Sequence, residues 1–149
     1  MTDNVLEVTV HIEAQPETVF SYFTDPAKYV QWMGSTARIV PEPGGEYWVH
    51  MRDGVEAAGK VVEIDPPKRV VFTWGWVADS AVPPGSSQIE VTFQSDKHGT
   101  LVTLRQHGLP SAEQSDHHQR GWELYLSRLA LCAAGREPGP DPNAGSRAY

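Results

Sequence analysis

The first regular pattern in the chain is an alternation of apolar and polar residues over positions 5–12. Its apolar members are Leu6, Val8, Val10 and Ile12. Alternation with a period of two is typical of a strand that buries one face. We therefore expect these four side chains to point into the core.

A short amphipathic helix is predicted next. Pro16 suits the first turn of a helix, and Glu17 suits its positive end. Apolar residues then follow at helical spacing, at Val19, Phe20 and Phe23. Because a proline disfavours helical backbone in the residue before it, Pro26 should end this helix, and a second short turn should lead to Trp32.

Segments of strand length alternate with groups of turn residues between Met33 and His107. The predicted strands cover residues 35–40, 46–51, 55–64, 69–76, 88–95 and 100–107. The connections between them are short, which favours antiparallel pairing, since a parallel crossover needs about a dozen residues or more. Asp53 and Gly54 give the clearest hairpin signal because they tolerate the positive φ angles of a two-residue turn.

A long helix is predicted from about Ser111 to Ala134, with Ser111 as its N-cap. One face of this helix carries Trp122, Leu126, Leu129 and Ala133, with Tyr125 and Cys132 beside them. We expect that face to press on the sheet. The residues after it are rich in proline, glycine and small polar side chains, so the chain divides into a domain over residues 1–136 and a disordered tail over residues 137–149. Deletion of residues 138–149 should leave the thermal midpoint nearly unchanged.

Composition and charge narrow the classes of function. The 149 residues are 40% hydrophobic and 21% charged, which fits a single globular domain. No apolar run approaches the roughly 18 residues of a membrane-spanning helix, so no membrane span is expected. The net charge of −7 has the wrong sign for a nucleic-acid partner. A single cysteine and the lack of a secretory signal pattern predict a cytoplasmic location.

Several short fragments in a fixed order resemble one protein family. These fragments are Ile12-Glu13-Ala14, Pro16-Glu17, Trp32, Pro43-Gly44-Gly45, Ile64-Asp65-Pro66-Pro67, RVVFTW at 69–74, Gly108-Leu109-Pro110 and Gly121-Trp122. In this order the chain resembles the START-like helix-grip (SRPBCC) superfamily, and within it the branch named for the C-terminal domain of the activator of the Hsp90 ATPase. The resemblance implies an α+β fold with a curved seven-stranded antiparallel sheet around a long C-terminal helix. It also implies a cavity between sheet and helix, which in many relatives holds an apolar or aromatic small molecule.

The predicted strand faces and the last helix place one set of side chains around that space. The set consists of Tyr47, Val49, Met51, Phe72, Trp74, Val91, Phe93, Val102, Leu104, Gln106, Trp122, Tyr125, Leu126 and Leu129. Gln106 occupies a position where relatives often carry histidine, and Tyr47, Gln106 or His107 would orient a ligand by hydrogen bonding. Periodicity alone does not distinguish a ligand pocket from a packed core, so both interpretations stay open.

Metal-binding and nucleophilic chemistry find little support in the sequence. His117 and His118 are adjacent, so on a helix they point about 100° apart and do not share a metal ion. Cys132 lies on an apolar helix face, which is typical of a small buried side chain rather than a reactive thiolate. We therefore expect no metal, no cofactor and no catalytic residue. A lone acid or base in the pocket, such as Glu56, is an alternative.

The leading interpretation is a binding protein for an apolar or aromatic small molecule. One alternative is a protein-interaction module similar to a chaperone regulator, which a side-chain-filled interior would favour. Another is an enzyme of the cyclase or hydratase type, which two convergent titratable groups in the pocket would favour. Leu124 and Leu131 project away from the Trp122 face of the last helix, which predicts either a homodimer contact or cover by a neighbouring loop.

Overall fold

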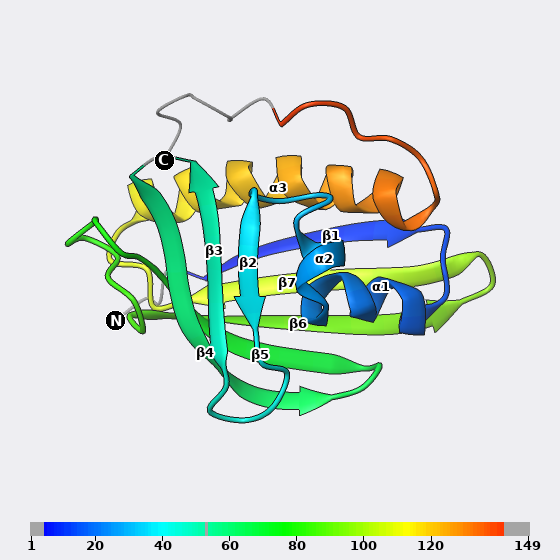
Figure 1. The fold of residues 1–149 in the computed structure, drawn as a ribbon, viewed down its shortest axis with the longest axis horizontal. Helices are drawn as coiled ribbons and strands as arrows, with labels where there is room; N and C mark the ends of the chain where they lie inside the picture. The colour runs from blue at the N-terminus through cyan, green and yellow to red at the C-terminus, as the bar shows by residue number, and fades with distance from the viewer. Residues whose placement is uncertain (1–4, 53, 142–149) are drawn as a thin grey trace.

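The computed structural model describes residues 5–52 and 54–141, and within them seven antiparallel strands form one sheet (Figure 1). The strands are β1 (Leu6–Ile12), β2 (Thr36–Ile39), β3 (Glu46–Arg52), β4 (Val55–Asp65), β5 (Arg69–Trp76), β6 (Ser87–Asp96) and β7 (Gly99–His107). Their order across the sheet is β1-β7-β6-β5-β4-β3-β2. Every predicted strand is present, and no strand begins or ends more than one residue from its predicted position.

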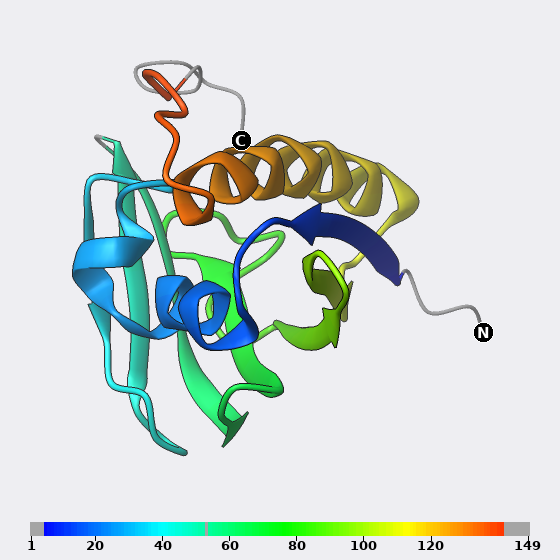
Figure 2. The ribbon, with the colours of Figure 1, turned by 90° about the vertical axis from the view of Figure 1, so that its right-hand side faces the viewer.

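Three helices complete the described part of the chain: α1 (Pro16–Thr24), α2 (Pro26–Tyr29) and α3 (Ala112–Ala133). The sheet curves around α3, which lies next to β1, while α1 and α2 occupy the connection from β1 to β2 (Figures 1 and 2). The architecture is the α+β helix-grip arrangement that the sequence predicts. It brings the buried face of α3 against the concave side of the sheet.

Local sequence explains where the helices begin. Pro16 occupies the first turn of α1, and the carboxylate of Asp25 accepts a hydrogen bond from the Ala27 amide at 3.0 Å at the start of α2. The predicted N-cap of α3 is confirmed, because the Ser111 hydroxyl accepts from the Gln114 amide at 3.1 Å. The chain leaves α3 through Gly135, whose φ of 81° is a conformation that glycine adopts without strain.

The hairpin between β3 and β4 is confirmed by the pairing of Arg52 with Val55. Gly54 has a φ of 75°, in the left-handed region that the turn prediction requires. Asp53, the other residue of that prediction, lies outside the described residues.

Aromatic rings fill much of the space between sheet and helices. Tyr47 on β3 stacks on Phe72 on β5 with ring centroids 3.9 Å apart. Phe93 on β6 meets the α1 residues Phe20 and Phe23 edge-on at 5.2 and 5.4 Å. Offset and edge-on contacts of this kind add to the stabilisation that area burial provides. This half of the interior is a packed core.

The segment after α3 runs back over that helix (Figure 1). Arg128 is buried on α3, and its Nη1 donates to the carbonyls of Pro138, Gly139 and Pro140 at 3.4, 3.1 and 3.2 Å. The Tyr125 hydroxyl donates to the carboxylate of Asp141 at 2.8 Å. Residues 138–141, which the sequence places in a disordered tail, therefore make specific contacts, while residues 142–149 lie outside the described residues.

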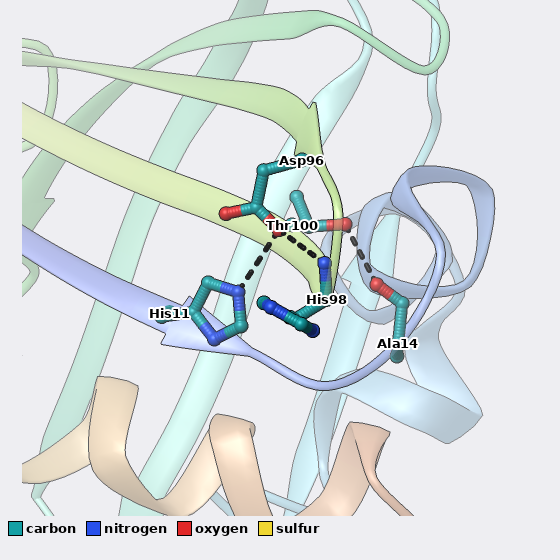
Figure 3. Close-up of polar contacts among 5 residues, drawn as sticks. All are labelled: His11, Ala14, Asp96, His98 and Thr100. Atoms are coloured by element: carbon teal, nitrogen blue, oxygen red, sulfur yellow. Dashed lines mark hydrogen bonds and ion pairs between the residues drawn. The ribbon is translucent and has the colours of Figure 1, made fainter.

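The β6–β7 turn is tied to β1 and to the chain that follows it (Figure 3). Asp96 Oδ1 lies 3.1 Å from His11 Nε2 and accepts from the His98 amide at 2.9 Å. The Thr100 hydroxyl donates to the Ala14 carbonyl at 2.7 Å. The amide of His98 and the ring of His11 lower the pKa of Asp96. These contacts anchor the edge strand β1.

Two further sequence predictions concern the surface of the molecule. Leu124 and Leu131 on α3 are half-buried, and Leu124 packs against the core, so a homodimer contact through them stays a prediction. Among the helices of the described residues, none combines the length and the apolar character needed to cross a membrane.

Candidate functional site

Three tryptophans meet at one end of the interior. Trp74 and Trp76 lie two residues apart on β5, and their ring centroids are 5.5 Å apart at an interplanar angle of 82°. Trp122 on α3 lies 5.3 Å from Trp74. Alternate residues of a strand share a face, and the buried stripe of α3 presents Trp122 to that face. We call these three residues the tryptophan cluster.

A small, partly open cavity, which we call the internal cavity, lies beside the tryptophan cluster. It is lined by Met33, Trp74, Trp76, His118, Gly121, Trp122 and Tyr125. Its volume is about 10 Å³, which is close to the space that one water molecule needs. Of the residues predicted to surround a ligand, Trp74, Trp122 and Tyr125 line this cavity.

Two larger hollows open to solvent at the same end of the molecule. One has a volume of about 230 Å³ and is lined by Trp76, Asp79, Gln114, His117 and His118. The other has a volume of about 250 Å³ and is lined by Gly54, Val55, Glu56, Trp76, Ala78 and Asp79. They lie where the β3–β4 hairpin, the loop after β5 and the start of α3 gather at the left of Figure 1. Trp76 borders the internal cavity and both hollows.

Backbone contacts fix the strand end that carries Trp76. The Trp76 amide donates to the Val82 carbonyl at 2.6 Å, so the loop after β5 folds back onto the strand. Gly75 permits this approach, because a side chain at that position would collide with the backbone of Pro83. The loop therefore holds Trp76 at the edge of the interior.

A hydrogen bond joins Trp76 and His118, which both line the internal cavity. Trp76 Nε1 donates to His118 Nε2 at 3.0 Å, and His118 Nδ1 lies 2.8 Å from the Gln114 carbonyl. Because Nε2 accepts and Nδ1 donates, the ring is the neutral Nδ1–H tautomer. Burial lowers the pKa of His118, and the charge on His117 acts in the same direction, while the Gln114 carbonyl and Asp79 oppose them. We call this contact the Trp76–His118 latch.

A chain of hydrogen bonds supports the other side of the tryptophan cluster. Trp122 Nε1 donates to Gln106 Oε1 at 2.9 Å, and Gln106 Nε2 donates to the Ser87 hydroxyl at 3.0 Å. Ser87 in turn donates to the Trp74 carbonyl at 2.6 Å. Gln106 is fully buried, and both ends of its amide are engaged in holding the tryptophans.

Trp74 Nε1 is the exception in this network. Trp74 is 1% exposed, and its Nε1 is the one buried side-chain nitrogen or oxygen that lacks a hydrogen-bond partner within residues 5–52 and 54–141. Buried polar groups in native proteins are nearly always paired, so this donor requires an explanation.

The other predicted residues lie in the packed half of the interior. The Tyr47 hydroxyl donates to the Phe23 carbonyl at 3.2 Å, and burial raises the pKa of Tyr47 well above its usual value. The remaining members are all buried in the same core cluster: Val49, Met51, Phe72, Val91, Phe93, Val102, Leu104, Leu126 and Leu129.

The polar residues considered for ligand contacts or acid–base chemistry are not gathered in one place. Glu56 borders the larger hollow and accepts from Trp48 Nε1 at 2.8 Å. His107 is half-buried and follows Gln106 on β7, so its side chain points to the opposite face of the sheet. Both ring nitrogens of His118 are engaged by the latch and by Gln114.

The described residues offer little support for metal or thiol chemistry. Within the described ranges, no three histidine, cysteine, aspartate or glutamate side chains are grouped so as to hold a metal ion. Burial raises the pKa of the Cys132 thiol, and its Sγ lies 3.4 Å from the Gln31 carbonyl. A raised pKa disfavours the nucleophilic thiolate at neutral pH.

Four residues that line the internal cavity are absent from the sequence-predicted set, namely Met33, Trp76, His118 and Gly121. Trp76 continues the alternation of Phe72 and Trp74 along β5, so the two-residue period of the strand already indicated that its side chain faces the interior. His118 lies four residues before Trp122, one helical turn away, and its neighbour on the helix wheel is therefore the tryptophan. Met33 lies between α2 and β2, where no periodic pattern assigns a direction to its side chain.

Comparisons with known proteins place this geometry in a family. Residues 13–134 match the family model of activator of Hsp90 ATPase homolog 1-like proteins. No curated protein matched the chain. The solution NMR structure of an AHSA1-like protein from Rhizobium etli is 43% identical, with a TM-score of 0.75 over 98% of this chain and 91% of that one.

More distant structures share the fold. A protein of Chromobacterium violaceum is 22% identical, with a TM-score of 0.77 over 93% of this chain and 99% of its own. DynU16, from the dynemicin biosynthetic locus, is 23% identical, with a TM-score of 0.79 over 92% of this chain and 50% of its own. With the family model spanning most of the sheet and all of α3, the chain belongs to the activator of Hsp90 ATPase homolog 1-like family, within the START-like helix-grip superfamily.

Proposed function

We propose that the protein binds an apolar or aromatic small molecule at the tryptophan cluster, between the end of β5 and the first half of α3. The observation that carries the proposal is the position of Trp76, whose side chain borders the internal cavity and both outer hollows. Ligand sites are concave and mostly apolar, with a few convergent polar groups. The tryptophan cluster with His118 matches that description.

The closed arrangement has too little internal space for a ligand, so binding requires Trp76 to move. Neither hollow of about 230 or 250 Å³ reaches the roughly 300–1,000 Å³ of typical ligand pockets. Rotation of Trp76 away from His118 would join both hollows to the internal cavity. The volumes of the three spaces together come to about 490 Å³, which lies within that range.

Moving Trp76 has a cost that burial of the ligand must offset. Breaking the latch loses one hydrogen bond, whose net contribution is about 0.5–1.5 kcal/mol. An aromatic ligand that buries about 200 Å² of apolar surface gains about 5 kcal/mol at 25 cal/mol per Å². Rotation also exposes apolar surface of the Trp76 ring, which is 7% exposed in the closed arrangement, so part of that gain replaces the burial that the ring loses. The latch and the packing of Trp76 together therefore lower the affinity for a ligand.

The test uses N-phenyl-1-naphthylamine, an uncharged probe that fluoresces more strongly in apolar surroundings. Trp76→Ala removes the blocking ring and the latch, so the affinity for the probe should rise about three- to tenfold, the equivalent of one net hydrogen bond. Trp48→Ala is the matched control, because Trp48 lies on the outer face of β3. Circular dichroism checks that both variants are folded.

Probe affinities that are equal in the wild type, Trp76→Ala and Trp48→Ala would contradict binding at the tryptophan cluster. A rise in Trp48→Ala alone would move the site to the outer face of the sheet.

The close packing of the rest of the interior favours a second candidate, a protein-interaction module. A core filled by the Tyr47–Phe72 stack and the Phe93 contacts leaves the surface, rather than a cavity, as the binding element. Stimulation of an Hsp90 ATPase by the wild-type protein, unchanged by Trp76→Ala, would support this candidate. A lack of stimulation together with probe uptake supports the small-molecule site.

A further inference from the structure

The three indole N–H groups of the tryptophan cluster are not equivalent. Trp76 donates to His118, and Trp122 donates to Gln106. Trp74 Nε1 has no partner within the described residues, although its ring is the most deeply buried of the three. An unpaired buried donor destabilises a fold, and such groups in native proteins mark functional positions or bound molecules.

The polar groups around Trp74 are committed to other partners. The chain from Trp122 through Gln106 and Ser87 ends on the Trp74 backbone carbonyl, so it holds the strand rather than the indole. The walls of the internal cavity are otherwise aromatic or apolar, apart from His118, whose ring nitrogens are engaged. The indole N–H of Trp74 is thus the free donor of the cavity wall.

The charges around the site limit the chemistry of the acceptor. Glu56 and Asp79 border the outer hollows, and no lysine or arginine is among the described residues that line the three spaces. An anionic acceptor would be buried without a counter-charge, which is strongly unfavourable. A neutral oxygen such as a ketone avoids that penalty and still accepts from an indole.

We propose that the ligand class is a flat, uncharged aromatic compound with a carbonyl oxygen on its buried edge, and that Trp74 Nε1 donates to this oxygen. The inference rests on the proposed function and names the ligand chemistry of that same site. Once Trp76 has rotated away, the ring face of Trp122 would lie against the compound, which suits a planar ligand.

The experiment compares 9-fluorenone with fluorene, which have the same tricyclic carbon framework and differ by the ketone oxygen. Equilibrium dialysis measures both affinities for the wild type, for Trp74→Phe, which removes the N–H but keeps an aromatic ring, and for Trp48→Phe as the matched control. The ratio of fluorenone to fluorene affinity should fall about three- to tenfold in Trp74→Phe. It should be unchanged in Trp48→Phe.

Each outcome decides a different claim. An equal ratio in all three proteins, with both compounds bound, overturns the role of Trp74 and leaves the proposed function standing. Failure of all three proteins to bind either compound overturns the proposed function and this inference with it.

If the Trp74→Phe protein does not fold, a second measurement on the wild-type protein tests the same hydrogen bond. The infrared carbonyl stretch of fluorenone bound to the wild type should lie at lower wavenumber than in a hydrocarbon solvent, because hydrogen bonding weakens the C=O bond. A stretch at the hydrocarbon value overturns the proposal.

Discussion

Gln106 shows how a single residue serves the site indirectly. Its position in the sequence predicts a residue that orients a ligand, but both ends of its amide are bonded to Trp122 and Ser87. A buried amide with satisfied partners fixes side-chain positions, whereas an unsatisfied one would destabilise the core. The residues left for a ligand to contact are therefore the tryptophans that Gln106 positions.

His118 makes the latch sensitive to pH. Burial lowers the pKa of His118 in the folded protein below the value near 6.5 of an unfolded chain. Between these two values the unfolded state binds more protons, so stability from this group is present above pH 6.5 and is lost as the pH falls. Protonation of Nε2 also removes the acceptor that Trp76 uses.

We predict that the thermal midpoint of the wild type falls as the pH is lowered from 7 to 5, and that His118→Gln reduces this slope. The glutamine oxygen keeps an acceptor for Trp76 but does not titrate in this range. His98→Gln, on the exposed β6–β7 turn, is the control that should retain the wild-type slope. Midpoints measured by circular dichroism at several pH values provide the comparison, and identical slopes in wild type and His118→Gln would refute the assignment.

Helix α3 connects the segment after α2 with the C-terminal segment of the described chain. Arg128 donates through Nε to the Trp32 carbonyl at 3.1 Å and through Nη1 to the carbonyls of residues 138–140. Tyr125, which lines the internal cavity, donates to Asp141. The C-terminal segment therefore packs on the same helix that closes the tryptophan cluster.

Truncation of the chain tests this contact. A protein that ends at Glu137 loses the acceptors of Arg128 Nη1 and the partner of Tyr125, so its free energy of unfolding should fall by about 1–2 kcal/mol. A protein that ends at Asp141 keeps every contact described for this segment and should match the full chain. Urea denaturation measures both.

This prediction differs from the sequence expectation that the tail is dispensable, and the two truncated proteins decide between them. Equal stability of the two truncated proteins would restore that expectation and show that the carbonyl contacts contribute nothing measurable.

Across the whole molecule, the periodic patterns predict the fold but not the site. Alternation along β5 and the Ser111 cap of α3 are local signals, and both elements form where these signals lie. The burial of Arg128 is not local, because its acceptors come from Trp32 and from residues 138–140. Arginine is rarely buried without such partners, so its position depends on the tertiary structure.

The sequence pattern also does not predict how much of the interior is empty. The same inward-facing pattern at Tyr47 and Phe72 fits both a cavity wall and a packed core, and the two rings stack on each other. Trp74 and Trp122 follow the same inward-facing pattern, but they line a small cavity. Which of the two forms depends on side-chain shapes across the sheet, which periodicity does not record.

The most direct test of the small-molecule site follows the five indole N–H signals by two-dimensional NMR during titration with fluorene. Trp→Phe variants assign each signal. The account predicts saturable shifts of the Trp74, Trp76 and Trp122 signals, while Trp32, which donates to the Tyr22 carbonyl in the core, and Trp48 on the outer face of β3 stay in place. Signals that all remain fixed at saturating fluorene, or shifts confined to Trp32 and Trp48, would contradict it.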